Sequence, residues 1–514
     1  MKIEQQLKVM KLPENWATCE LDDVLLKISN GANVTQHDEK IGYPICRIET
    51  IWNESIDLGR VKYIKENNKE FVDKYALQYG DILLSHINSD AHLGKTGLYK
   101  NQVETLIHGI NILLIRPVEQ FSSDFLNYQI KHLRAKGVFI DAAQRSVNQS
   151  SINQKKLKSF QIIVAPLLEQ QRIVAKIEEL FSELDKGIEN LKSTRAQLKV
   201  YRQALLKHAF EGKLTVQLRA ENQDKLETAD ALLKRIQHER AERYKQQLAD
   251  WQTTGGSKPK APKSLPPLTA DELSELPELP QGWGWCKLGD FIDSIDAGKS
   301  FKCDEREPRT NEIGVAKVSA VTWGEYDESE SKTCTDSSKE NEAYLIQRGD
   351  FILSRANTID LVGACVIARK VTKKIMLSDK TLRIRFGYFP QEYFLQYLGS
   401  RIGRKQIMLL STGNQESMRN IGQERIRSIT VPICSVVEAN VVIESLAVRL
   451  FEVDQLELTI ATSLQQSEAL RQSILKKAFS GKLVAQDPQD EPATALLARI
   501  KADKFLRDKK SIQI

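Results

Sequence analysis

The sequence predicts a mixed α/β (α+β) protein in which two long antiparallel coiled-coil helices separate two tandem globular domains, with a pseudo-two-fold internal repeat. Three observations support this fold class. The stretch from Arg202 to Leu214 returns late in the chain, from Arg471 to Leu483, with nine of its thirteen positions identical. Apolar residues at heptad spacing precede both stretches, as in a coiled coil. Upstream of each heptad region, short β-branched runs alternate with Gly, Asn and Asp, as in mixed α/β globules.

The repeat extends beyond these two stretches, and its parts keep the same order in both copies. The other matching pairs are LPENW (12–16) with LPQGW (279–283), GDILLS (80–85) with GDFILS (349–354), INQKKLKSFQI (152–162) with IGQERIRSITV (421–431), and ALLKRI (231–236) with ALLARI (495–500). A chain of 514 residues is too long for one ordinary core, and a repeated order of motifs indicates one structural unit used twice. We therefore predict globular domains at 1–165 and 279–431.

A long helix is predicted after each globule. Pro166 and Pro432 stand where a helix commonly begins, and Gly212 and Gly481 stand where a C-terminal cap favours glycine. The heptad positions between them are Ile177, Leu184, Leu191, Leu198 and Leu205 in the first copy, and Leu446, Val453, Ile460 and Ile474 in the second. These patterns predict helical, coiled-coil regions at 166–255 and 432–514, with a linker rich in Gly, Pro and Lys at 256–278.

The two predicted helices are expected to pair with each other. Their apolar seam is narrow and its flanks are highly charged, which favours a coiled coil. Antiparallel pairing would place the two globules at opposite ends of the helices. The alternative is that each helix packs on its own globule.

Composition is that of a soluble globular protein. The chain is 41% hydrophobic and 28% charged, and its net charge of +6 permits a polyanionic partner without requiring one. The N-terminus shows no signal peptide, and no apolar run approaches the roughly 20 residues of a membrane-spanning helix. The seven cysteines are scattered without a C-x-x-C pair, which is typical of reduced thiols. We therefore expect a cytoplasmic protein without membrane contact.

The sequence offers no catalytic motif. It contains neither a phosphate-binding G-x-x-x-x-G-K-[ST] loop nor a G-x-G-x-x-G after a strand. The seven histidines are not at metal-binding spacing, and His86 is replaced by Arg355 in the second copy, which disfavours a general base common to both. The chain is therefore expected to be non-enzymatic and to bind no cofactor or metal itself.

Recognition is the function that the repeat favours. The frame segments are alike in both copies, whereas the segment 30–52 bears little likeness to 296–323. Similar frames with different tips imply two different targets at a fixed separation, and a DNA duplex read in two patches fits that arrangement.

Two polar loops in each copy carry the candidate DNA-contacting residues. Arg and Lys bond guanine edges and Asn and Gln bond adenine edges in the major groove, while the cations could contact phosphate instead. The alternative is that these segments are ordinary polar turns. The candidates are Asn88, Ser89, His92, Lys95, Arg145, Asn148 and Gln149 in the first copy, and Arg355, Asn357, Thr358, Asn414, Gln415 and Arg419 in the second.

In order and repetition, these motifs resemble a known family over essentially the whole chain. The two LP-x-x-W segments, the two [YR]GD-x-[IL]LS segments and the two helices ending in LLKHAFEGKL and ILKKAFSGKL resemble the specificity subunit of type I restriction–modification enzymes. The long charged segment from about Glu221 to Gln281 departs from the shortest members, and only a truncated echo of it follows at 489–514.

The resemblance implies that 1–165 and 279–431 are target-recognition domains, which read the two parts of a split, asymmetric DNA site. The helical regions would be spacers and docking surfaces for two methyltransferase subunits, forming an adenine-N6 methyltransferase. With further restriction and motor subunits the complex would be an ATP-dependent endonuclease. S-adenosylmethionine, ATP and Mg²⁺ would bind to those partners. One rival hypothesis is a coiled-coil protein scaffold without direct DNA contact; a second is a fused modification enzyme, which the missing cofactor loops disfavour.

Overall fold

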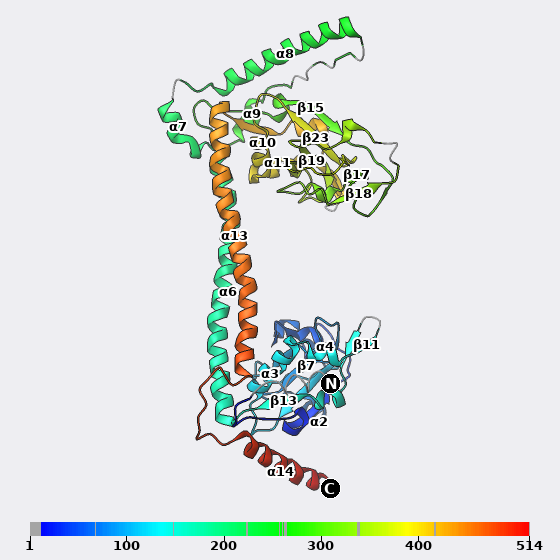
Figure 1. The fold of residues 1–514 in the computed structure, drawn as a ribbon, viewed down its shortest axis with the longest axis vertical. Helices are drawn as coiled ribbons and strands as arrows, with labels where there is room; N and C mark the ends of the chain where they lie inside the picture. The colour runs from blue at the N-terminus through cyan, green and yellow to red at the C-terminus, as the bar shows by residue number, and fades with distance from the viewer. Residues whose placement is uncertain are drawn as a thin grey trace. The chain divides into compact units, whose positions relative to one another are not determined.

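The computed structural model describes residues 12–512 apart from 67, 147–148, 223–224, 256–257, 260, 262–264, 337–339 and 416–417. The chain forms two compact units: unit 1 combines Met1–Lys192 with Ile460–Ile514, and unit 2 is Ser193–Thr459. Each unit holds a mixed α/β globule together with parts of two long helices (Figure 1). No helix in the described part of the chain is both long and apolar enough to cross a bilayer.

The globule of unit 1 is built on an antiparallel sheet in the order β2-β10-β7-β9. The central strands β7 (Ile82–Ser85) and β10 (Ile112–Pro117) lie between β2 (Leu25–Asn30) and β9 (Thr96–Leu98). Side chains of a strand alternate between the faces of a sheet. Accordingly Leu84 and Leu113 face the core under α3 (Ser123–Ala135), whereas Leu83 and Leu114 face a second cluster. Burial on both faces explains why ILLS and ILLI are continuous apolar runs.

The remaining elements of unit 1 surround this sheet. They are β1 (Ala17–Glu20) paired with β13 (Gln161–Val164), β3 (Tyr43–Ile45) with β6 (Lys62–Ile64), β4 (Ile51–Trp52) with β5 (Ser55–Ile56), the three strands β8 (Ile87–Asn88), β11 (Gln144–Ser146) and β12 (Gln149–Ser151), and the helices α2 (Lys69–Tyr75), α4 (Val138–Ala142), α5 (Gln154–Lys158) and α14 (Ala493–Ile512).

The globule of unit 2 has the same central topology. Its sheet runs β15-β23-β19-β21, formed by β15 (Ile292–Ala297), β23 (Thr381–Phe386), β19 (Phe351–Ser354) and β21 (Cys365–Ile367). The other elements are β14 (Gly284–Lys287) with β26 (Thr430–Ile433), the strands β20 (Ala356–Asn357), β24 (Thr412–Gln415) and β25 (Met418–Asn420), and the helices α7 (Val216–Glu221), α8 (Ala229–Thr254), α9 (Ala270–Ser274), α10 (Gln391–Gly399), α11 (Arg401–Leu410) and α12 (Gln423–Arg427).

The outer strands form a more continuous sheet in unit 2 than in unit 1. Unit 2 has a four-stranded sheet in the order β16-β18-β17-β22, with bounds Cys303–Asp304, Ser331–Cys334, Gly314–Ala316 and Ile375–Met376. In unit 1 the corresponding part of the globule holds the pairs β3·β6 and β4·β5. Isolated bridges of unit 1, His37 with Tyr63 and Ile45 with Ile107, stand where β16·β18 and β17·β22 pair in unit 2, so the segments that are unlike in sequence keep one order of pairing.

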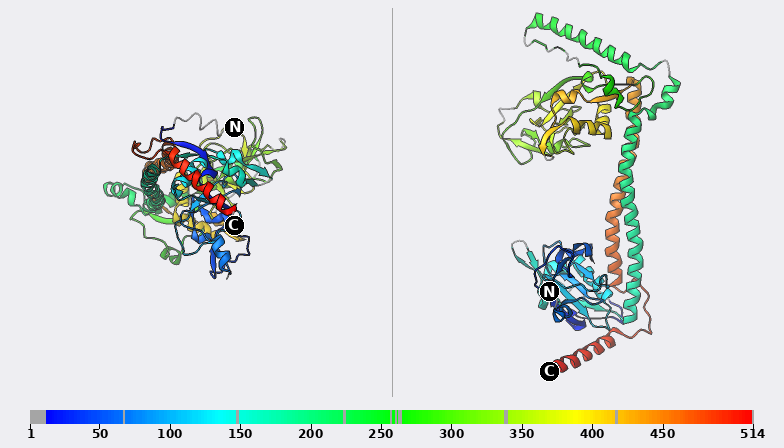
Figure 2. Two further views of the ribbon diagram at one scale, coloured as in Figure 1. Left: turned by 90° about the horizontal axis from the view of Figure 1, so that it is seen from below. Right: turned by 180° about the vertical axis from the view of Figure 1, so that it is seen from behind.

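Two helices of 44 and 43 residues, α6 (Leu167–Phe210) and α13 (Val436–Ala478), lie side by side within each unit (Figures 1 and 2). An ion pair joins Asp185 to Arg471 in unit 1, and another joins Arg202 to Asp454 in unit 2. In the repeat, Asp185 corresponds to Asp454 and Arg202 corresponds to Arg471, so the two ion pairs are equivalent. In unit 2, Arg219 beyond α6 bonds Glu438 near the start of α13, so the paired segments run antiparallel there.

The heptad residues are buried to different degrees. Those that are buried are Ile177, Leu205, Leu446, Val453, Ile460 and Ile474; Leu184, Leu191 and Leu198 are only partly buried. The predicted limits of the domains, at 165, 255, 278 and 431, stay a prediction.

Each long helix ends in the core of the globule that belongs to the other copy of the repeat. Phe479, just after α13, lies in the core of unit 1, where its ring centroid is 5.3 Å from that of Phe125. Phe210, the last residue of α6, lies in the core of unit 2, with centroids 5.1 Å from Tyr393 and from Tyr397. The repeated stretch at the end of each long helix therefore completes the core of one unit. We call this stretch the plug.

The glycine of this repeat meets the proline of LP-x-x-W. Gly212 and Gly481 both have φ of +69°, a conformation that favours glycine. A Cβ atom on Gly212 would lie 2.6 Å from Cγ of Pro280, and one on Gly481 would lie 2.2 Å from Cγ of Pro13. Two motifs that are far apart in the sequence are thus in contact with each other, and this contact is made once in each unit.

The charged segments after the plugs also begin in these cores. Ala229, Leu232 and Ile236 of α8 are buried in unit 2, and Ala493, Leu496 and Ile500 of α14 are buried in unit 1. Lys504 on α14 further binds Asp22 at 2.9 Å. The ALLKRI and ALLARI repeats therefore mark a second helix that is anchored in each core.

We expect Phe479→Ala to destabilise unit 1 and Phe210→Ala to destabilise unit 2. Removing a buried phenylalanine from a packed core costs about 3–5 kcal/mol of the free energy of unfolding. Hydrogen exchange should accelerate in β10 for the first variant and in β23 for the second. Phe505→Ala is the matched control, because Phe505 is 60% exposed. Equal loosening of both units by Phe479→Ala would contradict the assignment of this residue to one core.

Candidate nucleic-acid interface

The two candidate loops of each globule are joined by one three-stranded sheet. In unit 1 the order is β11-β12-β8, and in unit 2 it is β20-β25-β24. Asn88 pairs with Ser150 in the first sheet, and Asn357 pairs with Arg419 in the second. These two pairs occupy equivalent positions in the repeat. The two candidate loops of each unit, which are far apart in the sequence, are therefore neighbours at one surface.

The asparagine of each sheet is held in the same way. Oδ1 of Asn88 accepts a hydrogen bond from the backbone N–H of Ser89 at 2.8 Å, and Oδ1 of Asn357 accepts one from Thr358 at 2.9 Å. This local bond fixes the side chain and leaves the amide nitrogen as a donor. In Asn88 that nitrogen donates to Oγ of Ser85 at 3.3 Å, whereas in Asn357 it has no partner within the described ranges.

The other candidates lie on the same surfaces with different exposure. Exposed side chains are those of Ser89, His92, Arg145, Gln149, Thr358 and Gln415, and partly buried ones are those of Asn88, Lys95, Arg355, Asn357 and Arg419. Asn148 lies outside the described residues, and of Asn414 only the backbone in β24 is described. Contact of these residues with DNA stays a prediction.

The cations differ in how far their side chains are already engaged. Arg419 donates to the carbonyl oxygens of Gly413 at 2.8 Å and Ser411 at 2.9 Å, so it holds the start of β24. Arg145 lies 3.7 Å from a carboxylate oxygen of Asp90. The side chain of Arg355 makes no hydrogen bond or ion pair with the described part of the chain, which leaves its guanidinium available to a ligand.

A partly buried arginine clamp positions the loop that follows β8 and its counterpart after β20. Arg134 at the end of α3 donates to the carbonyl oxygens of Leu93 at 3.0 Å and Ala91 at 2.7 Å. Arg404 of α11 donates to Val362 at 2.6 Å and also to Ile359. Charge-assisted bonds to carbonyls restrain a loop strongly. Neither arginine stands out in the sequence, because both lie on helices outside the polar loops.

The same arginines also contact a hairpin tip, but with different chemistry. In unit 1 Arg134 lies 3.4 Å from a carboxylate oxygen of Glu54, which follows β4. In unit 2 Arg404 lies 4.8 Å from the ring centroid of Trp323. An ion pair in one unit is thus replaced by a cation–π contact in the other.

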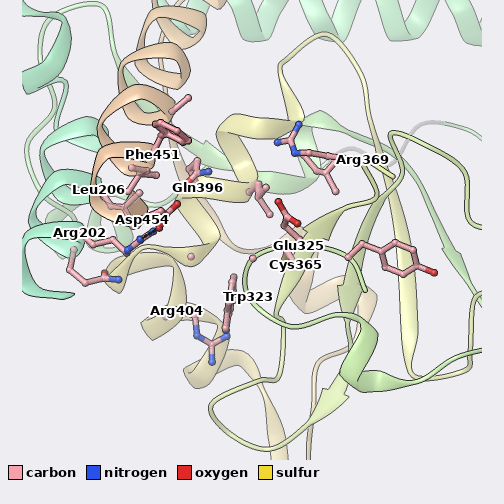
Figure 3. Close-up of a pocket in the computed structure, with 18 of the residues that line it drawn as sticks. Arg202, Leu206, Trp323, Glu325, Cys365, Arg369, Gln396, Arg404, Phe451 and Asp454 are labelled. Atoms are coloured by element: carbon pink, nitrogen blue, oxygen red, sulfur yellow. Dashed lines mark hydrogen bonds and ion pairs between the residues drawn. The ribbon is translucent and has the colours of Figure 1, made fainter. Parts of the chain in front are cut away.

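Unit 2 contains a cleft of about 950 Å³ between its helix pair and its globule (Figure 3). Arg202, Phe451 and Asp454 line it from the helices, and Trp323 and Arg404 line it from the globule. Arg202 pairs with Asp454 and Arg404 stacks on Trp323, so these charges already have partners. We therefore propose no ligand for this cleft.

Unit 1 contains a groove of about 390 Å³ beside its three-stranded sheet. Three sequence candidates line it, Asn88, His92 and Lys95, together with Trp52 and Arg60 from the hairpin segment. Nζ of Lys95 donates to Nδ1 of His92 at 2.7 Å. Desolvation, together with the charges of Lys95 and Arg134, lowers the pKa of His92, which favours the neutral ring as an acceptor. Trp52, which is 43% exposed, was not identified from the sequence.

Comparison with known proteins points to one family. Residues 13–193 match the family described as the type I restriction modification DNA specificity domain. The chain is 39% identical over 213 residues to the putative type I restriction enzyme MjaX specificity subunit of Methanocaldococcus jannaschii, a match that covers 41% of this chain and 50% of the relative. It is 27% identical over 488 residues to the EcoEI specificity subunit of Escherichia coli, covering 84% of this chain and 77% of the relative.

A solved chain from a study of complex assembly and conformational transition of the type I R-M system has the same fold. It aligns with a TM-score of 0.62 at 16% identity, over 92% of this chain and 99% of that chain. The resemblance to type I specificity subunits that the sequence indicated is therefore confirmed, while the match to the first relative spans only half of its length.

We expect Arg134→Ala to release the loop 89–94. The backbone carbonyls of Leu93 and Ala91 would lose their charged donor, so the loop should become mobile while the sheet of unit 1 persists. Hydrogen exchange of peptides from this loop should rise severalfold, with β10 unchanged. Arg47→Ala, which removes another arginine of unit 1 whose partner Glu49 lies outside this loop, should leave the exchange of the loop as it is.

We also expect unit 1 to be more acid-sensitive than unit 2. Burial lowers the pKa of His86, His108 and His132 from 6.5 to about 4, whereas the unit 2 histidines, His208 and His238, are exposed. Between about pH 6.5 and 4 the unfolded chain binds protons that these buried rings exclude, so the free energy of unfolding falls as the pH falls.

Urea titrations across this pH range would measure the effect. His86→Gln should make the stability of unit 1 less dependent on pH, and His208→Gln should not. A pH slope in unit 1 that His86→Gln leaves unaltered would show that other groups cause it.

Proposed function

We propose that this chain is the non-catalytic DNA sequence-recognition subunit of a type I restriction–modification complex, and that it reads a bipartite, asymmetric site. The repeated frame with unlike tips supports the proposal most strongly. Each unit presents the same three-stranded sheet and arginine-clamped loop, while the neighbouring outer segments differ in sequence. One frame with two different surfaces suits two different half-sites on one duplex.

Each unit would read its half-site from its three-stranded sheet. An asparagine amide that is fixed by a local bond, as in Asn88 and Asn357, is suited to bidentate pairing with adenine in the major groove. Among the described residues the guanidinium of Arg355 has no partner, so it suits guanine or phosphate. The paired helices α6 and α13 would set the distance between the half-sites as an antiparallel coiled coil.

The helices would also dock two methyltransferase subunits and, through them, restriction and motor subunits. Apolar side chains on α13 that stay exposed support this role: Val448 and Phe451 are 61% and 62% exposed, and Leu458 is 62% exposed. Such residues favour a protein interface over water. S-adenosylmethionine, ATP and Mg²⁺ would bind to the partner subunits. The complex would act on DNA in the cytoplasm.

Selection from random duplex DNA by the chain in complex with its methyltransferase partner tests the proposal. We expect a split motif with a spacer of fixed length, bound with an affinity that falls steeply with salt because phosphate contacts release counterions. Asn357→Ala should relax one half of the motif by roughly 10-fold, and the matched variant Asn88→Ala should relax the other half. One continuous motif would contradict the proposal, and no DNA binding would favour the coiled-coil scaffold instead.

A further inference from the structure

An arginine at the rim of the unit 1 groove is held in place by two contacts. The guanidinium carbon of Arg60 lies 3.8 Å from the ring centroid of Trp52. Nε of Arg60 donates to Oδ2 of Asp57 at 3.0 Å. Asp57 is itself fixed, because its Oδ1 accepts from the backbone N–H of Gly59 at 2.9 Å. Stacking sets the plane of the guanidinium, and the ion pair sets its rotation within that plane.

The remaining edge of this guanidinium forms no hydrogen bond with the described part of the chain. Within the described ranges the two Nη nitrogens of Arg60 have no hydrogen-bond partner, and its side chain is 40% exposed. An unrestrained surface arginine gives up rotamer freedom when it binds, whereas Arg60 is already ordered. The cluster therefore presents two parallel N–H donors in a fixed direction beside the groove.

We propose that Arg60 is a specificity-determining residue that reads a guanine in the half-site bound by unit 1. This inference rests on the proposed function and names a base that it recognises. Guanine offers two adjacent acceptors, O6 and N7, in the major groove, and a planar guanidinium edge matches both of them. Asn88 and Lys95 line the same groove, so neighbouring bases or phosphates would meet further donors.

Unit 2 has the same turn, but without the stacked and ion-paired arginine. Asp327 corresponds to Asp57, since its Oδ1 accepts from the backbone N–H of Ser329 at 2.9 Å. When the two turns are aligned on these aspartates, Glu330 takes the position of Arg60 and Thr322 takes that of Trp52. The backbone pairing agrees with this alignment, because Val321 bridges Tyr326 in unit 2 as Ile51 pairs with Ile56 in unit 1.

A carboxylate cannot donate to guanine, and Glu330 already accepts from Oγ of Ser319 at 2.5 Å. Guanine recognition by this turn is therefore a property of unit 1 alone. The turn is one place where two copies of the same frame acquire different base preferences.

The experiment compares DNA selection by the full chain in its methyltransferase complex, for the wild type and for three variants. Arg60→Ala removes the donors, and Arg60→Lys keeps the charge but loses the paired edge. Arg47→Ala is the matched control, because Arg47 is similarly exposed in the same segment and pairs with Glu49 at 3.3 Å. Thermal unfolding of each variant checks that unit 1 is folded.

We expect the unit 1 half-site to contain a guanine whose preference falls on the order of 10- to 100-fold in Arg60→Ala. Arg60→Lys should also lose much of this preference, while the unit 2 half-site and the Arg47→Ala motif stay as in the wild type. If Arg60→Ala weakens binding to all sequences equally, Arg60 contacts phosphate and the inference is wrong. An unchanged motif, or a unit 1 half-site without guanine, would also overturn it.

These outcomes are distinct from a failure of the proposed function. In that case the wild-type complex would select no split motif at all. A split motif that keeps its guanine in Arg60→Ala would reject only the role of Arg60.

Discussion

The structure depends on the insertion of each long helix end into a core that the other copy builds. Phe479 and Phe210 fill equivalent positions between aromatic rings of the two globules. The glycine that follows each of them lies against the proline of an LP-x-x-W segment, too close for any side chain. Because these contacts tie a helix to each core, the globules and the helices cannot be understood as independent parts. The hydrophobic effect and close packing of the plug thus account for the most strongly repeated stretch of the chain.

The same frame leaves its recognition surfaces free to differ. Arg134 and Arg404 hold equivalent loops through backbone carbonyls, so the loop sequences themselves are not constrained by the clamp. The clamp even tolerates a change of partner, from the carboxylate of Glu54 to the ring of Trp323. Outward from the clamp the differences grow, and the turn that carries Arg60 in unit 1 carries Glu330 in unit 2. A frame that both copies share through main-chain contacts is compatible with different side chains on the surfaces it displays.

Much of this organisation could be predicted from the sequence, since repetition and heptad spacing are linear patterns. The long helices, their buried residues such as Ile177 and Ile474, and the family resemblance all follow from such patterns. The candidate loops were found because Asn, Ser and Arg cluster there. Their junction in one small sheet could not be predicted, since it depends on pairing between segments that are distant in the sequence. Trp52, Arg60 and Arg134 were missed, because their roles come from tertiary contacts that no local pattern encodes.

The division of the chain between the units also has a consequence for biosynthesis. Unit 2 is one continuous stretch, Ser193–Thr459, and its core is complete once that stretch has left the ribosome. The first part of unit 1 is translated earlier, but its core also includes Phe479 and Ile500, which are translated after unit 2. Domains usually fold in the order in which they emerge. Here the first globule to appear must wait, with an open core, until all of unit 2 has been translated.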